Sequence, residues 1–306
     1  MSVRSAADFD LAGYLARERG HAEKALGRTA ARVRTELPAS VAEAVAHGLL
    51  GGGKRLRPVL CATAYRACGG DGDHATVYDL AVSVELVHAY SLMHDDLPCM
   101  DDAELRRGRA TTHRVHGVES TVRAGAVLIP LAIRQARRGA LSLGCGEDVA
   151  RAVARDLAKA AGAGGMVGGQ VLDLLGEGRR LAAEELHRLH RLKTGALLAA
   201  SLRMGARAAD APARLAAALD AYGRAVGLAF QIADDVLDAT ASAGELGKNP
   251  SDGLLEKSTY VSLYGLEEAR RRGEGQVERA CAALDAVSLE APALRALAGY
   301  VTERRR

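Results

Sequence analysis

The segment AVGLAFQIADDVLD, residues 225–238, is apolar on nearly every face of a helix. Such a pattern is typical of a helix that other helices surround. Four polar side chains interrupt it at i, i+3, i+4 and i+7, and a helix places them on one stripe: Gln231, Asp234, Asp235 and Asp238. Because burying unpaired carboxylates costs several kcal/mol each, this stripe predicts that bound cations neutralise it.

The rest of the chain favours the same fold class. Alanine, leucine and arginine dominate, β-branched residues are sparse, and no stretch of strict alternation demands a sheet. We expect an all-α fold, with helices divided at Gly, Pro and Asp-Gly signals. The predicted helices are 6–18, 20–36, 39–50, 55–68, 75–97, 118–140, 147–162, 165–175, 182–205, 212–240, 252–272, 274–285 and 292–304. Since there is no solenoid-type repeat and no Ser/Pro-rich linker, residues 1–306 are expected to form a single domain, one large helical bundle.

Composition narrows the function classes. The 306 residues are 48% hydrophobic and 26% charged, as is ordinary for a soluble globular protein. A net charge of +3, with short arginine runs that lack interleaved aromatic residues, does not indicate a nucleic-acid partner. No apolar run is long enough to span a bilayer, so no membrane insertion is expected. The five cysteines are scattered without a Cys-x-x-Cys pair, which predicts reduced thiols in a cytoplasmic protein.

A second acidic cluster, LMHDDLPCMDD, occupies residues 92–102. Pro98 should end the helix, so that Asp95 and Asp96 lie on its last turn and Asp101 on the following loop. On an unbroken helix Asp101 would point about 120° away from Asp95, and the break is what can bring both to one metal. Either cluster alone could be a solvated helix end, but two in apolar helices favour a site. Oxygen-only ligands favour Mg²⁺, whose shell is completed by water and substrate phosphates, so a phosphate ester or diphosphate substrate is expected.

Basic segments supply candidate phosphate ligands. In GGGKRLRP, residues 51–58, a glycine turn leads into a helix, and Lys54 and Arg57 are spaced to reach one phosphate. The spacing is not that of a Walker loop. Further basic candidates lie in the pairs Arg106–Arg107 and Lys193–Thr194 and at Lys248 and Lys257, although each alone is more typical of a surface charge.

In chain order, these segments resemble the motif set of the trans-isoprenyl diphosphate (polyprenyl) synthases, from about residue 48 to residue 264. The segment LPCMDDAELRRG, residues 97–108, is most similar to short-chain bacterial farnesyl and geranylgeranyl diphosphate synthases. The resemblance implies an isoprenoid synthase type I fold, with helices around a central apolar cavity, and a homodimer. It implies a transferase that condenses isopentenyl diphosphate head-to-tail with dimethylallyl, geranyl or farnesyl diphosphate. Mg²⁺-assisted ionisation would give a carbocation, and the product would be farnesyl (C15) or geranylgeranyl (C20) diphosphate.

The resemblance also implies roles for individual residues. Mg²⁺ would be held by the two acidic triplets, Asp95, Asp96 and Asp101 with Asp234, Asp235 and Asp238. The allylic diphosphate would be bound by Arg106, Lys193, Thr194, Gln231, Lys248 and Lys257. Isopentenyl diphosphate would be bound by Lys54, Arg57, His88 and Arg107. The six aspartates, Lys193 and Arg106 would form the catalytic set.

Product length is expected to depend on Tyr90, five residues before the first aspartate, and on its neighbour Ser91. This role comes from the resemblance alone, since a helix places Tyr90 about 140° from Asp95. A bulky Tyr favours C15, whereas the Pro-Cys-Met sequence favours C20. Two other functions stay open, a class I terpene cyclase and a non-catalytic partner subunit of a prenyl synthase. The paired Asp-Asp-x-x-Asp pattern and the absence of Trp disfavour the cyclase, and the intact triplets disfavour the inactive partner.

Overall fold

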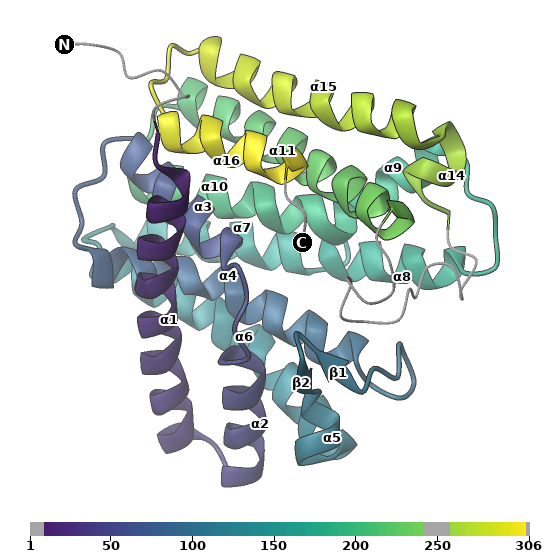
Figure 1. The fold of residues 1–306 in the computed structure, drawn as a ribbon. Helices are drawn as coiled ribbons and strands as arrows, with labels where there is room; N and C mark the ends of the chain where they lie inside the picture. The colour runs from purple at the N-terminus through teal and green to yellow at the C-terminus, as the bar shows by residue number, and fades with distance from the viewer. Residues whose placement is uncertain (1–8, 241–257, 304–306) are drawn as a thin grey trace. The chain divides into compact units, whose positions relative to one another are not determined.

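The computed structural model describes residues 9–240 and 258–303 and is helical almost throughout, which confirms the all-α prediction (Figure 1). The described residues form two compact units. The N-terminal unit comprises Leu15–Ala62 and Asp71–Arg155. The C-terminal unit comprises Thr63–Gly70 and the described parts of Met1–Tyr14 and Asp156–Arg306. The expectation of a single domain stays a prediction, and each unit is described by itself.

The N-terminal unit is built on two long antiparallel helices, α4 (His74–Asp95) and α6 (Val118–Ser142), which pack along each other. The close approach needs small residues, because a Cβ on Gly139 would overlap the backbone of Leu80. The other elements wholly or largely in this unit are α1 (Leu11–Glu36), α2 (Ala39–Leu49), β1 (Leu105–Arg106), β2 (Arg109–Ala110), α5 (Thr112–His116) and most of α7 (Glu147–Ala161). Helix α3 (Leu56–Ala67) begins in this unit and ends in the other.

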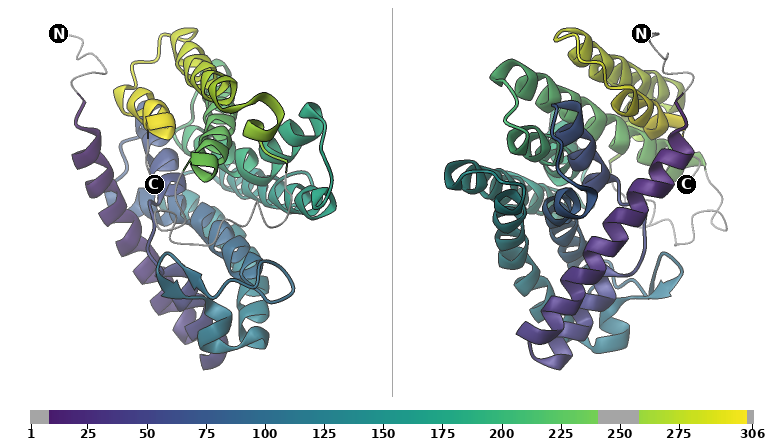
Figure 2. Two further views of the ribbon diagram at one scale, coloured as in Figure 1. Left: turned by 45° about the vertical axis from the view of Figure 1, so that its right-hand side comes forward. Right: turned by 90° about the vertical axis from the view of Figure 1, so that its left-hand side faces the viewer.

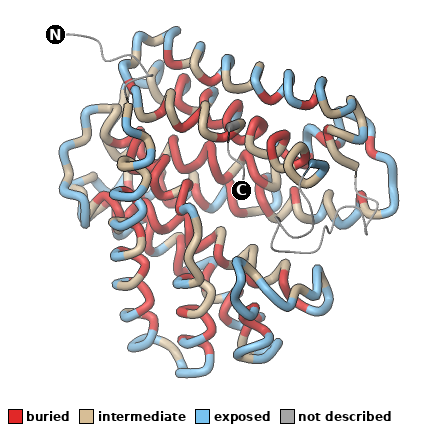
Figure 3. The backbone as a smooth tube through the Cα atoms, in the orientation of Figure 1, coloured by how far each residue is buried: buried red, intermediate tan, exposed pale blue. Residues whose placement is uncertain are grey.

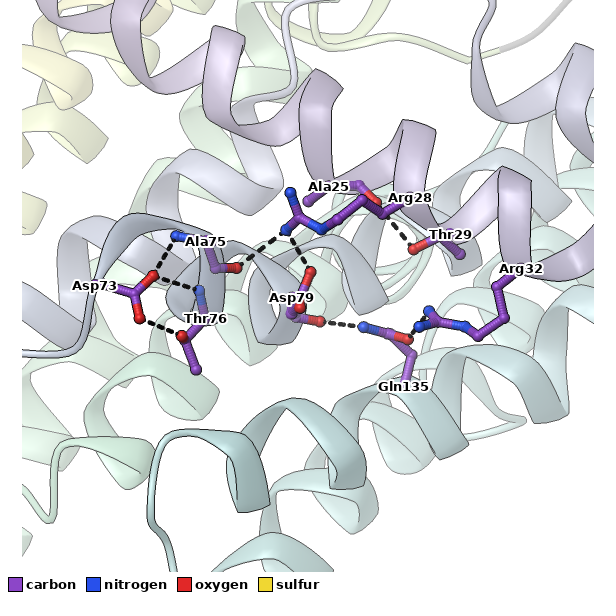
Figure 4. Close-up of polar contacts among 9 residues, drawn as sticks. All are labelled: Ala25, Arg28, Thr29, Arg32, Asp73, Ala75, Thr76, Asp79 and Gln135. Carbon is purple, nitrogen blue, oxygen red and sulfur yellow. Dashed lines mark hydrogen bonds and ion pairs between the residues drawn. The ribbon is translucent and has the colours of Figure 1, made fainter.

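Polar contacts fasten α1 to this helix pair (Figure 4). Arg28 donates to the carboxylate of Asp79 on α4 at 2.5 Å, and Arg32 donates to Gln135 of α6 at 2.6 Å. Gln135 in turn donates to the carbonyl of Asp79 at 2.5 Å, so one amide joins the two helices. Helix α4 begins where Asp73 caps it by accepting from the N–H groups of Ala75 and Thr76.

In the C-terminal unit, α15 (Leu266–Asp285) lies antiparallel along α11 (Ala213–Thr240) in every view (Figure 2). An apolar cluster that includes Leu228, Ile232, Tyr260 and Ala269 packs residues of α11, α14 (Tyr260–Tyr264) and α15 together. The remaining elements of this unit are α8 (Met166–Gly176), α9 (Ala183–His190), the π-helical turn η2 (Arg191–Gly195), α10 (Ala196–Ala208) and α16 (Pro292–Glu303).

Buried residues concentrate on α4, α10 and α11 (Figure 3). Burial on all sides of α4, which includes Ser83 and Glu85, shows that neighbouring structure surrounds this helix. Among the described residues, no helix is both long and apolar enough to cross a membrane.

Four local predictions were wrong. Gly20 does not divide 6–18 from 20–36, since α1 runs through it, and Gly273 likewise lies inside α15. The predicted helix 182–205 contains the π-turn η2. In the predicted helix 252–272 the described residues break at Gly265, whose φ of 78° ends α14. The β1–β2 hairpin and α5 were not predicted.

Candidate active site

The first acidic cluster lies at the end of α4, in the N-terminal unit. Helix α4 ends at Asp95, and Asp96 is its C-cap residue. The chain then turns back, so that the N–H of Asp101 donates to the carbonyl of Asp95 at 2.9 Å. The predicted break therefore occurs, and it brings the backbone of Asp101 against that of Asp95.

Asp96 is turned toward an arginine instead of solvent. Arg106 forms a fork with it, with Nε to Oδ1 at 2.7 Å and Nη2 to Oδ1 at 2.6 Å, and the Asp96 side chain is 5% exposed. The hairpin explains the position of the arginine. Its two-residue turn is Arg107–Gly108, with φ of 55° and 73°, and Arg106 on β1 pairs with Arg109 on β2.

Arg107 continues from this turn to the glycine loop. Its guanidinium donates to the carbonyl of Gly52, and a Cβ on Gly53 would overlap that guanidinium. Arg109 donates to the carbonyl of Leu50 at 3.2 Å. The β1–β2 hairpin and the glycine loop are thus held together by arginine–carbonyl contacts, and Gly53 leaves room for the Arg107 guanidinium.

His88 lies in the N-terminal unit within electrostatic range of several arginines. Burial lowers the pKa of His88 well below its ordinary value, and the charges of Arg57, Arg107, Arg106 and Arg55 lower it further. The ring is therefore neutral at pH 7 in a field of positive charge. Arg57 and Arg107, which the resemblance assigns to isopentenyl diphosphate together with His88, are thus close enough to His88 to affect its pKa.

A cavity of about 40 Å³ lies beside these residues. Asp96, Arg106, Arg107, Arg109 and Thr112 are among the side chains that line it. Its volume is enough for a few water molecules. Three arginines against one aspartate make its wall net positive, which suits an anion.

The two residues expected to control product length lie on the last turns of α4. Tyr90 is half-buried, packs edge-on against His94 with ring centroids 5.1 Å apart, and has its pKa raised by burial and by Asp95. Ser91 donates its hydroxyl to the carbonyl of His88 at 2.9 Å. A Cβ on Gly125 would overlap the ring of His94, so the α6 glycine leaves room for this pair.

The second acidic cluster lies on the last turns of α11, in the C-terminal unit. The predicted stripe forms, and Gln231 donates to the carboxylate of Asp234 at 3.3 Å. Asp235 points inward: it is 7% exposed, accepts from the backbone N–H of Tyr260 at 2.7 Å, and lies 3.4 Å from Nε2 of His190. Asp235 therefore anchors the start of α14.

Lys193 and Thr194 lie on the π-turn η2 of the same unit. Lys193 forms an ion pair with Asp173 of α8 at 2.7 Å, and Thr194 is buried. A Cβ on Gly169 would overlap the backbone of Lys193, so glycine lets α8 approach the turn.

Asp173 was missed by the sequence analysis. Its available signal was a carboxylate that follows Gly168-Gly169-Gln170 inside an otherwise apolar segment. Lys248 and Lys257, two predicted allylic diphosphate ligands, lie outside the described residues.

The carboxylates fit Mg²⁺. Among the described residues, no three acidic, histidine or cysteine side chains converge as a ready-made metal cage. Mg²⁺ needs none, because it commonly uses one or two carboxylates and completes its shell with water and substrate phosphates. Asp95 with Asp101, and Asp234 with Asp238, would supply carboxylate oxygens of this kind.

Comparisons with known proteins agree with this chemistry. The family model described as Polyprenyl synthetase matches residues 38–288. Geranylgeranyl pyrophosphate synthase 12, chloroplastic, of Arabidopsis thaliana is 40% identical over 97% of this chain and 82% of its own length. Farnesyl diphosphate synthase of Escherichia coli is 41% identical over 86% of this chain and 89% of its own length.

Solved structures are similar over nearly the whole chain. A geranyltransferase from Legionella pneumophila superposes with a TM-score of 0.82 at 28% identity, covering 96% of this chain and 97% of its own. An FPP/GFPP synthase from Zymomonas mobilis gives a TM-score of 0.79 at 32% identity, covering 94% and 99%. With its aspartate clusters and glycine loop in the expected order, the chain belongs to the polyprenyl synthetase family and is a prenyltransferase.

Proposed function

We propose that this prenyltransferase condenses isopentenyl diphosphate head-to-tail with dimethylallyl, geranyl or farnesyl diphosphate and releases farnesyl or geranylgeranyl diphosphate. The observation that carries the proposal is the arrangement of each acidic cluster. In both, the second aspartate is held by protein groups, Asp96 by Arg106 and Asp235 by Tyr260. Beside these two held carboxylates, the outer aspartates of each triplet are the proposed Mg²⁺ ligands, on the resemblance of the two triplets to the family's motifs.

The proposed metal ligands are Asp95 and Asp101 in one unit and Asp234 and Asp238 in the other. Mg²⁺, when bound there, would neutralise the diphosphate and assist its departure from the allylic carbon. Arg106 supports the same departure, because its contacts with Asp96 use Nε and Nη2 and its Nη1 donors can bind a phosphate oxygen. Lys193, oriented by Asp173, adds a second charge that stabilises the leaving diphosphate.

The isopentenyl diphosphate would bind to Lys54, Arg57, His88 and Arg107. Neutral His88 can donate one hydrogen bond to a phosphate oxygen without adding charge. The double bond of isopentenyl diphosphate attacks the allylic cation, and a proton leaves the adjacent carbon to the released diphosphate. No side chain need act as the base, and the apolar helices exclude the water that would convert the cation to an alcohol.

A homodimer is the proposed assembly. Val118, Val122 and Ile129 are 46%, 42% and 38% exposed. Their spacing places them on one face of α6. An exposed apolar stripe of this kind supports a protein–protein contact.

We also propose a cytoplasmic location, which is supported by the five cysteines, all described and all free thiols.

The alternatives lose support. A terpene cyclase or an inactive partner subunit would be expected among relatives with those names, whereas the relatives are named as synthases and a dimethylallyltranstransferase. Both aspartate triplets are present.

The test is product analysis by mass spectrometry. Purified protein is incubated with Mg²⁺, isopentenyl diphosphate and, separately, dimethylallyl, geranyl or farnesyl diphosphate. Linear diphosphates lengthened by C5 units are expected, and the longest one decides between C15 and C20. Cyclic hydrocarbon, or no elongation of any allylic substrate, would overturn the proposal.

A further inference from the structure

Arg55 differs from the basic residues beside it. Lys54 is exposed and Arg57 is half-buried, but Arg55 is only 3% exposed. A buried guanidinium between two candidate phosphate ligands cannot bind the phosphate from solvent. Its position therefore calls for a different role.

The guanidinium of Arg55 joins three helices of the N-terminal unit. Nη1 donates to Glu85 of α4 at 2.8 Å, and Nε donates to Glu23 of α1 at 2.8 Å. Nη2 donates to the carbonyl of Leu49, the last residue of α2, at 2.7 Å. Glu85 is as buried as Arg55, with 3% exposure. Burial alone would lower the pKa of Arg55, but Glu85 and Glu23 outweigh it and raise the pKa, so the charge is retained.

The backbone around Arg55 is held in an uncommon conformation. Gly52 and Gly53 have φ of 76° and 129°, which glycine adopts readily. Arg55 itself has φ of 51°, a left-handed conformation that side chains with a Cβ disfavour. The contacts of its guanidinium compensate for this cost, and so the side chain of Arg55 fixes the course of the loop 50–57.

The same loop positions a residue from the hairpin. The carbonyl of Gly52 accepts from Arg107, and the carbonyl of Leu50 accepts from Arg109. The loop therefore carries Lys54 and Arg57 itself, and it positions Arg107 through the carbonyl of Gly52. All three were assigned to isopentenyl diphosphate.

We propose that Arg55 is a positioning residue that, through Glu85, Glu23 and the Leu49 carbonyl, sets the loop on which the isopentenyl diphosphate ligands converge. It does not touch the substrate, and it controls the affinity for isopentenyl diphosphate more than that for the allylic diphosphate. The inference rests on the proposed function of this site.

The test compares Arg55→Lys with the charge-balanced pair Arg55→Met/Glu85→Met. Lysine keeps the charge but lacks the fork that joins three acceptors. The double variant removes both buried charges together, so that neither is left unpaired if the single variant fails to fold. Arg28→Lys is the matched control, since Arg28 forms an ion pair with α4 in the same unit but lies on the Asp79 network.

Thermal melts first establish which variants are folded. The KM for isopentenyl diphosphate is expected to rise at least about 10-fold in Arg55→Lys and in the double variant, with the allylic KM and kcat within about 3-fold of wild type. Calorimetric titration with isopentenyl diphosphate should show the same loss without turnover. Arg28→Lys should leave both KM values unchanged.

A purely structural role predicts a lower melting temperature and equal effects on both substrates, and that result would overturn the inference. So would a folded double variant with wild-type affinity for isopentenyl diphosphate. If wild-type protein neither binds isopentenyl diphosphate nor elongates an allylic substrate, the proposed function fails and this inference fails with it. If wild-type protein elongates allylic substrates and the variants keep wild-type affinity for isopentenyl diphosphate, only this inference fails.

Discussion

Asp96 and Asp235 occupy the second position of their clusters, and protein groups hold both of them. In each cluster one carboxylate thus fixes local structure, and the proposed metal ligands are its neighbours in the triplet. Loss of the buried Asp96 carboxylate is expected to destabilise the fold, because it leaves Arg106 without its main anion.

Asp95→Asn and Asp96→Asn should therefore affect different quantities, the first mainly the Mg²⁺ requirement and the second mainly the stability. Asp95→Asn is expected to raise the Mg²⁺ concentration for half-maximal rate at least about 10-fold. Asp96→Asn is expected to shift that concentration less than about 3-fold and to lower the free energy of unfolding by about 2 kcal/mol. Mg²⁺ titrations of the rate and urea unfolding measure the two quantities. Equal Mg²⁺ shifts in both variants would contradict the division of roles.

Two cysteines should differ in reactivity because one is buried and the other is exposed. Burial raises the pKa of the Cys61 thiol to about 12, so almost none of it is thiolate at pH 8. Cys99, in the loop between Asp96 and Asp101, is exposed. Iodoacetamide at pH 8 should alkylate Cys99 and leave Cys61 unmodified, and raising the pH should increase Cys61 labelling only as its pKa is approached. Peptide mass spectrometry measures the labelling of each cysteine. If Cys61 were labelled as fast as Cys99, Cys61 would not be buried in solution.

At the scale of elements, glycines decide how closely helices approach. Gly169 of α8 faces the backbone of Lys193, where a Cβ would overlap it, whereas a Cβ on Gly20 of α1 would meet nothing within 4 Å. The same substitution should thus have opposite effects at these two positions.

Gly169→Ala is expected to push α8 from the π-turn, to lower stability by about 1–3 kcal/mol and to raise the allylic KM, because the Asp173–Lys193 pair is displaced. Gly20→Ala should raise stability by about 0.5–1 kcal/mol and leave both KM values unchanged. Chemical denaturation and initial rates measure both. If Gly169→Ala changed neither the stability nor the allylic KM, α8 would not need this close approach.

The same elements show what sequence could and could not predict. Apolar segments divided at Gly, Pro and Asp-Gly signals predicted the helices α4 and α11, and Pro98 predicted the break after Asp96. Gly20 and Gly273 were taken as helix ends, but a glycine inside a helix costs only about 1 kcal/mol, which tertiary packing outweighs. The hairpin at 105–110 is too short for alternation, and only Gly108 signalled its turn. The contacts of Arg55, Asp96 and Asp173 were not predicted because their partners are far away in sequence or on other elements.

For the whole molecule, the exposed stripe on α6 bears on assembly. Val122 lies between Val118 and Ile129 on that face and is 42% exposed. Val122→Asp should place a charge in the proposed dimer contact and convert the dimer to a monomer without lowering the melting temperature of the monomer. Light scattering after size exclusion gives the mass. A wild-type monomer, or a variant that stays dimeric, would contradict the use of this face.

The central claim is that both acidic clusters serve one Mg²⁺-dependent condensation. The direct measurement is the condensation rate, across a Mg²⁺ titration and in EDTA, of wild type, Asp95→Asn, Asp234→Asn and the control Asp102→Asn. Asp102 is exposed and adjacent to the first cluster, and its φ of 45° is one that Asn tolerates.

We expect no product in EDTA, a loss of at least about 100-fold in kcat/KM for Asp95→Asn and for Asp234→Asn, and a rate within about 3-fold of wild type for Asp102→Asn. Condensation in EDTA, or near wild-type rates when either cluster is disabled, would contradict the claim.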